Sequence, residues 1–175
     1  SPAGLGFLSE VVRAWEGATR PLADAGLAVS MARTGIVLAP DGGALAPLLR
    51  LARLGLGGPI GSGRQFWPVI SLTDEVAALT FLIDHPDLTG PVNVVGVEPV
   101  RQRDLMSALG ALLHRPAVLP APKFAVRAVI GEIAGEITAS QRVLPERLRA
   151  AGFEHRHSTV AAALASILDP TKRAG

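Results

Sequence analysis

The amino-acid sequence predicts an α/β fold from three observations. An amphipathic helical pattern over 7–22 leads into an apolar stretch over 27–38, and a helix followed by a strand buried on both faces is one unit of an α/β sheet. Helix-like and strand-like segments keep alternating along the rest of the chain. No repeat with a period of about 20 to 50 residues is present, which argues against a solenoid or a propeller.

The composition indicates a soluble protein with a large core. The chain has 175 residues, of which 49% are hydrophobic, which is enough for one domain or for one lobe of a larger protein. The basic residues over 142–149 are typical of a solvated helix face, so we expect no nucleic-acid partner. We expect the partner to be a small-molecule substrate. The absence of cysteine excludes disulfides, and no run reaches about 18 apolar residues, so we expect a cytoplasmic protein without membrane contact.

The first helix–strand unit contains one charge that needs a partner. Apolar residues recur at helical spacing over 7–22, and Ala25 with Gly26 ends this helix. Within the strand predicted over 27–38, Arg33 is the single charged residue. Because an unpaired buried charge is costly, Arg33 must find a carboxylate, a carbonyl group or a ligand, and Glu16 on the preceding helix is a plausible partner.

The central part of the sequence predicts a helix, a glycine-rich segment, a strand and a second helix. The leucine-rich helix over 44–54 ends in Gly55 and the glycines after it. A strand follows over 66–72. Thr73 is expected to be the N-cap of a helix over 74–85.

The remaining segments follow the same logic of apolar spacing, proline near helix starts and glycine at helix ends. We expect a strand over 92–97, helices over 101–114, 123–137 and 145–151, a short edge strand over 153–157, and a last helix that Ser158 or Thr159 caps and that ends at Leu168.

The segment 58–76 concentrates groups that can bind a ligand. Arg64 offers a planar guanidinium to a carboxylate or a phosphate, and Trp67 offers a flat face for stacking. The run over 57–63 contains a Gly-x-Gly pattern, but it follows a helix and precedes a strand. That order is the reverse of a dinucleotide-binding fingerprint, so we interpret the segment as the lining of a cleft.

Seven short motifs occur in the order found in one known family. They are Gly6-Phe7-Leu8, Trp15-Glu16, residues 33–38, residues 57–65, residues 90–94, residues 113–116 and Ala151-Gly152-Phe153. With these motifs the chain resembles, over about residues 4 to 168, the epimerase-family proteins of the atypical short-chain dehydrogenase/reductase group, also labelled nucleoside-diphosphate-sugar epimerases.

The resemblance implies which part of such a protein this chain represents. It implies the C-terminal portion of an extended short-chain dehydrogenase-like Rossmann fold, with a mixed α/β substrate lobe and with the N-terminal nucleotide-binding half absent. Residues 1–40 are then the last helix–strand unit of the sheet, 41–170 the substrate lobe and 171–175 a polar tail. The implied cofactor is NAD or NADP, held mostly by the absent half.

One departure from the family leaves enzymatic activity open. Ordinary short-chain dehydrogenases carry Tyr-x-x-x-Lys on the helix before the Arg33-type strand, where the lysine lowers the tyrosine pKa for proton transfer. Here that helix has Phe7, Leu8, Val11 and Val12, and the chain has no tyrosine. The resemblance therefore implies an epimerase or reductase that acts on a nucleotide-sugar or small carbonyl compound. The alternative is a non-catalytic, NAD(P)-linked binding or regulatory protein.

The predicted site residues fall into two groups. The substrate-binding candidates are Arg33, Arg64, Gln65 and Trp67, and the cofactor-binding candidates are Thr34 and Gly35. An interdomain tie is the alternative for Arg64 and Gln65, and a place in the core or the cleft wall is the alternative for Trp67. The family often has histidine where this chain has Ser71, so the chain departs from the family at a position that could transfer protons.

The other charged and imidazole groups are interpreted as structural. Asp74 and Glu75 point about 100° apart on a helix, so they are helix-start charges rather than a carboxylate pair. His155 and His157 share one face of the predicted edge strand, but we interpret them as surface histidines and expect no metal site.

Truncation of a doubly wound sheet predicts self-association. The strand over 27–38 would lose its usual neighbours, and apolar faces would be exposed. We therefore expect the fragment to associate with itself or to pair with its N-terminal half.

Overall fold

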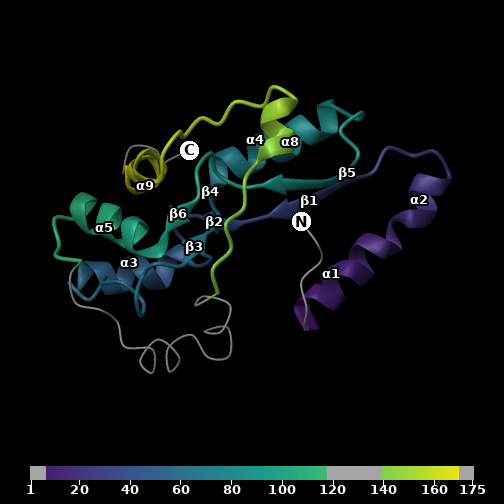
Figure 1. The fold of residues 1–175 in the computed structure, drawn as a ribbon. Helices are drawn as coiled ribbons and strands as arrows, with labels where there is room; N and C mark the ends of the chain where they lie inside the picture. Colours follow the sequence, from purple (N-terminus) through teal and green to yellow (C-terminus); the bar gives the residue numbers. More distant parts are fainter. Residues whose placement is uncertain (1–6, 118–138, 170–175) are drawn as a thin grey trace.

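The structure is a computed structural model that describes residues 7–117 and 139–169. The helix predicted over 123–137 and the tail predicted over 171–175 lie outside the described residues. Helices and strands alternate as the sequence predicts (Figure 1). In chain order they are α1 (Phe7–Ala18), α2 (Arg20–Asp24), β1 (Ser30–Thr34), β2 (Ile36–Leu38), α3 (Leu45–Arg53), β3 (Phe66–Trp67), β4 (Val69–Ser71), α4 (Leu72–Asp84), β5 (Gly90–Val94), β6 (Val100–Arg101), α5 (Gln102–Leu112), α8 (Glu146–Ala150) and α9 (Val160–Leu168).

The described strands pair two by two. β1 lies parallel to β5, with Ser30 opposite Gly90 and Thr34 opposite Val94. β2 lies parallel to β4, and β3 lies antiparallel to β6. The two parallel pairs are typical of an α/β fold, in which a crossover segment separates the partners in the sequence.

Gly35 is the point where the chain changes from one strand pair to the other. Its N–H donates to the carbonyl of Val94 at 2.9 Å, and the next N–H, that of Ile36, donates to the carbonyl of Pro68 at 2.6 Å. A Cβ atom on Gly35 would lie 2.1 Å from the Pro68 carbonyl oxygen. The prediction of one strand over 27–38 is therefore wrong, because pairing begins at Ser30 and changes partner at Gly35.

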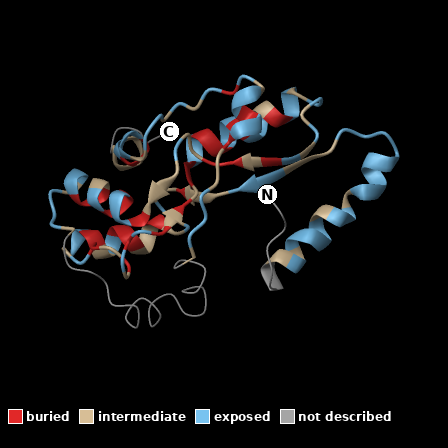
Figure 2. Ribbon diagram, viewed as in Figure 1, coloured by how far each residue is buried: buried red, intermediate tan, exposed pale blue. Residues whose placement is uncertain are grey.

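Two hydrophobic clusters form the core (Figure 2). The first lies among α3, α5 and α9, where Leu45, Leu105 and Leu164 are fully buried. The second lies beneath α4 and α8 and includes Val92 and Val94 of β5. By contrast, α1 and α2 extend away from the other described elements and are mostly exposed (Figures 1 and 2).

Several predicted boundaries differ from the structure. The helix over 7–22 is divided at Thr19 into α1 and α2. The strand over 66–72 is divided at Pro68, which has no N–H to donate, and the strand over 92–97 covers 90–94 instead. Residues 153–157 form no strand.

The predicted N-cap of α4 is also wrong. Ser71, rather than Thr73, has extended backbone angles, and its hydroxyl accepts the N–H of Asp74 at 3.1 Å. The side chain of Ser71 therefore satisfies one of the free donors at the start of α4.

Within 7–117 and 139–169, no helix is both long and apolar enough to cross a bilayer.

Candidate functional site

A cavity of about 530 Å³ lies at the carboxyl ends of β1 and β5. The strand ends contribute Thr34, Gly35 and Asn93, and the segment before α8 contributes the polar residues Gln141 and Arg142. Asn93 anchors that segment, because its amide Nδ2 donates to the carbonyl of Leu144 at 3.2 Å. The cavity is thus lined by hydroxyl, amide and guanidinium groups that can bind a polar ligand.

Arg33 lies at the edge of this cavity, and Glu16 is its partner, which confirms the predicted pair. The Nε atom of Arg33 donates to Oε1 of Glu16 at 2.6 Å, and Nη2 donates to Oε2 at 2.8 Å. The hydrogen bond from Arg33 holds the pKa of Glu16 below its ordinary value. This two-pronged ion pair ties α1 to β1.

Thr34 connects the cavity to a buried carboxyl group. Its Oγ1 lies 2.8 Å from Oε1 of Glu75, which is 6% exposed in the first turn of α4. Burial raises the pKa of Glu75, and the hydrogen bond from Thr34 offsets this effect only in part. The interpretation of Glu75 as a helix-start charge places it correctly in the sequence but misses its burial and its partner.

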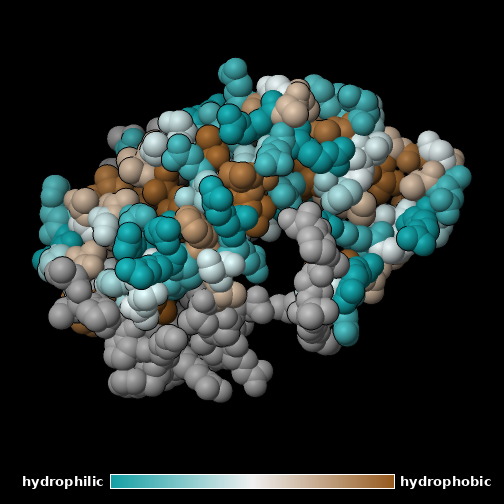
Figure 3. All heavy atoms as spheres, in the orientation of Figure 1, coloured by the Kyte–Doolittle hydropathy of each residue, from teal (hydrophilic) through white to brown (hydrophobic). Residues whose placement is uncertain are grey.

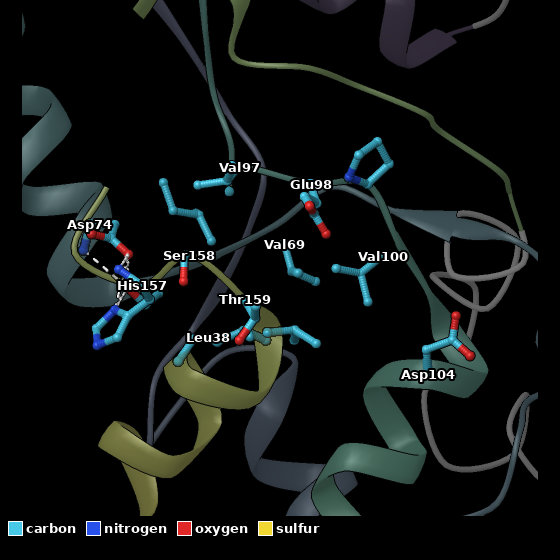
Figure 4. Close-up of a pocket in the computed structure, with 16 residues that line it drawn as sticks. Leu38, Val69, Asp74, Val97, Glu98, Val100, Asp104, His157, Ser158 and Thr159 are labelled. Carbon is cyan, nitrogen blue, oxygen red and sulfur yellow. Dashed lines mark hydrogen bonds and ion pairs between the residues drawn. The ribbon is translucent and has the colours of Figure 1, made fainter. Parts of the chain in front are cut away.

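A second cavity of about 200 Å³ lies between the segment after β5 and the start of α9. Asp74 and His157 lie side by side at one end of it, and Asp104 lies at the other end (Figure 4). Thr159 caps α9 here, because its side chain accepts the N–H of Ala162 at 3.2 Å.

Asp74 is the centre of a hydrogen-bond network beside the second cavity. Its Oδ2 lies 2.8 Å from the hydroxyl of Ser71 and 3.0 Å from Nδ1 of His157, and its Oδ1 accepts the N–H of Arg156 at 2.7 Å. Burial acts to raise the pKa of Asp74, but these hydrogen bonds outweigh it and hold the pKa below its ordinary value.

This network corrects the interpretation of the two histidines as surface groups. The His157 side chain is 9% exposed, and His155 directs Nε2 at the carbonyl of Val95 at 2.8 Å. Both histidines fasten the segment after α8 to the sheet. The Ser71 hydroxyl and the Asp74 carboxylate both meet Nδ1 of His157. A catalytic triad instead needs the hydroxyl and the carboxylate on different nitrogens of the imidazole, so this arrangement is structural.

The other predicted substrate residues lie away from both cavities. Arg64 is exposed, and its carbonyl accepts Nη1 of Arg101 at 2.8 Å. Gln65 is buried and donates to the carbonyl of Ile60 at 3.1 Å. Trp67, at 3% exposure, packs in the first core cluster, as its alternative interpretation expects. Contact of these three residues with a substrate stays a prediction.

Among the described residues, no group of three or more histidine, aspartate or glutamate side chains could hold a metal ion.

Comparison with known proteins shows similarity along nearly the whole chain. An epimerase family protein of Mycobacterium bovis is 47% identical over 163 residues, which are 93% of this chain and 54% of that protein. Epimerase family protein SDR39U1 of Mus musculus is 40% identical, over 96% of this chain and 58% of that protein. A family described as "Domain of unknown function (DUF1731)" matches residues 121–167.

Solved structures give the same result. The human epimerase family protein SDR39U1, solved with NADPH, superposes with a TM-score of 0.85 at 35% identity, over 95% of this chain and 57% of that one. The nucleoside-diphosphate sugar epimerase of Corynebacterium glutamicum superposes with a TM-score of 0.72 at 31% identity, over 96% of this chain and 32% of that one.

The fold is thus the mixed α/β fold of epimerases and short-chain dehydrogenases. The chain is similar to epimerase family proteins along nearly all of its own length, and it spans about half the length of the curated relatives that it matches.

Proposed function

We propose that this chain forms the substrate side of an NAD(P)-dependent epimerase-like or reductase-like protein that acts on a nucleotide-sugar or a small carbonyl compound. The observation that carries the proposal is the cavity beside Thr34 and Gly35. It lies at the carboxyl ends of two parallel strands, where open α/β sheets bind their ligands. The NADPH in the human relative's structure supports this choice of cofactor.

The groups around this cavity fit the polar end of a nicotinamide cofactor. The Thr34 hydroxyl and the amides of Asn93 and Gln141 can pair with a carboxamide or with ribose hydroxyls. When bound, such a cofactor supplies hydride transfer. This chain has no glycine fingerprint for the pyrophosphate, so we assign the rest of the cofactor site to the part of the relatives that this chain does not span.

We expect the full-length protein to bind NADPH and the 175-residue chain alone to bind it far more weakly, because the chain lacks the pyrophosphate site. Isothermal titration of both proteins measures the difference. A full-length protein without NADPH binding would overturn the proposed function. Micromolar binding by the chain alone would overturn the division of the cofactor site. Turnover of NADPH with a nucleotide-sugar, a quinone or a carbonyl compound separates an enzyme from the non-catalytic alternative.

On the substrate side, we propose that Arg64 binds the phosphate groups of a nucleotide-sugar. Its exposed guanidinium offers the two-pronged geometry that phosphate prefers. In the same full-length protein, replacement of Arg64 by alanine should weaken the binding of uridine diphosphate about tenfold, which corresponds to one lost charge-assisted contact. Arg53→Ala, at the exposed end of α3, is the matched control and should leave the affinity unchanged.

We also propose that apolar faces of this chain pack against the rest of its protein, or against a second copy when the chain is alone. Leu72, Val76, Leu79 and Ile83 follow one another at helical spacing along α4, and Ile83 is 79% exposed. Apolar side chains also reach the surface at several places on the face in Figure 3.

We expect light scattering of the chain alone to give a mass above that of one copy. Ile83→Lys should lower this mass, because a charge on the apolar face of α4 opposes its burial. Leu54→Lys, at a position that is 73% exposed beyond the end of α3, should leave the mass unchanged. A mass of one copy together with cooperative unfolding would contradict this proposal.

A further inference from the structure

Glu75 is a buried acid with half of its hydrogen-bonding capacity unused. One oxygen, Oε1, meets the hydroxyl of Thr34 at 2.8 Å. The other, Oε2, is buried and has no hydrogen-bond partner among the residues that the structure describes. A carboxylate with an unpaired buried oxygen is far more costly than a neutral carboxylic acid in the same place. The site therefore favours the protonated form of Glu75.

The charges around Glu75 leave this preference in place. α4 packs against β1, β2, β4 and β5, and Arg33 on β1 is the one charged residue of these strands. Glu16 already pairs with the guanidinium of Arg33. On α4 itself, the adjacent Asp74 is bonded to Ser71, to His157 and to the N–H of Arg156. No cation in the described residues compensates a charge on Glu75.

Thr34 gives this buried proton a route to the cavity. Thr34 lines the cavity at the end of β1, and its hydroxyl can donate one hydrogen bond and accept others. When Glu75 is protonated, it donates to Thr34 Oγ1, and the Thr34 hydrogen is free for a ligand. When Glu75 is a carboxylate, Thr34 donates to it, and its oxygen can only accept from a ligand.

We propose that Thr34 and Glu75 form a proton-exchange pair for the first cavity, with Thr34 in contact with an alcohol, carbonyl or amide oxygen of the ligand. The proposal rests on the proposed function for the identity of that ligand. It supplies within this chain the proton transfer that a tyrosine performs in other short-chain dehydrogenases, since the chain has no tyrosine.

The proton transfer balances without electron transfer. In one direction, the proton on Glu75 Oε1 passes to Thr34 Oγ1, and the original hydroxyl proton of Thr34 passes to an alkoxide oxygen of the ligand. The ligand becomes an alcohol, and Glu75 becomes a carboxylate. In the other direction, an alcohol gives its proton to Thr34, and Thr34 gives its own to Glu75.

Titration of the Glu75 carboxyl by carbon-13 NMR tests the pair without any ligand, and Glu75→Gln assigns the resonance. We expect Glu75 to titrate above the ordinary range for glutamate. Thr34→Val should move the midpoint further upward, because the hydrogen bond from Thr34 lowers the pKa of Glu75. Thr34→Ser should restore the wild-type midpoint. Thr80→Val is the control, since Thr80 bonds to the carbonyl of Val76 on the exposed side of α4.

An ordinary midpoint, or one that Thr34→Val leaves in place, would overturn the pair. The link to the cavity is tested by the NADPH affinity of the full-length protein at several pH values. This affinity should change across the Glu75 midpoint in the wild type and lose that dependence in Glu75→Gln. Binding of NADPH without this dependence would overturn the link. Loss of NADPH binding altogether would overturn the proposed function alone, because the NMR titration needs no cofactor.

Discussion

Replacement of Gly35 by alanine is expected to lower the free energy of unfolding by about 3 kcal/mol, at the upper end of the range for overpacked sites. The new methyl group would lie 2.1 Å from the carbonyl oxygen of Pro68 and 3.0 Å from Cγ1 of Val95. The neighbour at 2.1 Å is backbone, so relief of the contact requires the chain at Gly35 and Ile36 to move away from Pro68, where β2 begins to pair with β4. Two strand pairs would be disturbed by one atom.

Urea denaturation of Gly35→Ala measures this loss, and Gly17→Ala is the matched control. Gly17 lies within α1 and has nothing within 4 Å of an added Cβ. There the same substitution should stabilise the chain by up to about 1 kcal/mol, since alanine favours the helix. Equal midpoints for Gly35→Ala and the wild type would show that the strands accommodate the methyl group and that the packing inferred at this switch is wrong.

Replacement of Asp74 by alanine is expected to lower the free energy of unfolding by about 3 kcal/mol at neutral pH, which is typical for the loss of a buried network. The substitution leaves the N–H of Arg156, the N–H of His157 and the hydroxyl of Ser71 without the carboxylate that they meet. It also removes the attachment of the segment after α8 to the start of α4.

The stability that Asp74 provides should depend on pH in a defined direction. Because its pKa is lower in the folded state, the contribution is fully present above the ordinary pKa of aspartate. It is lost as the pH falls through the lowered pKa of the folded state. The difference between the wild type and Asp74→Ala should therefore shrink in acid. Asp84→Asn, at the exposed end of the same helix, should stay within about 0.5 kcal/mol of the wild type at every pH.

Elements defined by local patterns are the ones that the sequence predicts closely. The expected helices over 44–54 and 145–151 agree within one residue at each end with α3 and α8, because apolar spacing, proline and glycine act over a few residues. The strand over 27–38 was wrong because its division depends on pairing with β4 and β5, which lie far away in the sequence.

The same distinction holds for the candidate site. The Glu16–Arg33 pair was predicted from the cost of an unpaired buried charge. The partner is right, but the predicted burial of the strand on both faces is wrong, because Arg33 is exposed and β1 contains no buried residue. The contacts of Asp74 with 156–157 could not be predicted from local patterns, since Arg156 lies 82 positions after Asp74 in the sequence. One local signal was available for α4. Ser71 followed three residues later by an acid resembles a capping box, which places the helix start at Ser71 rather than at Thr73.

The long separation between Asp74 and its partners also bears on how this chain folds. The bonds to Arg156 and His157 close loops of 82 and 83 residues, and the hydroxyl of Ser30 reaches the carbonyl of Leu88 across 58. Closing such loops costs conformational entropy before the new contacts contribute any stabilising free energy, and this order of events slows folding. α4 can form early from its own sequence. The buried carboxylate of Asp74 at its start gains its hydrogen bonds from 156–157 only when the C-terminal part of the chain packs against α4.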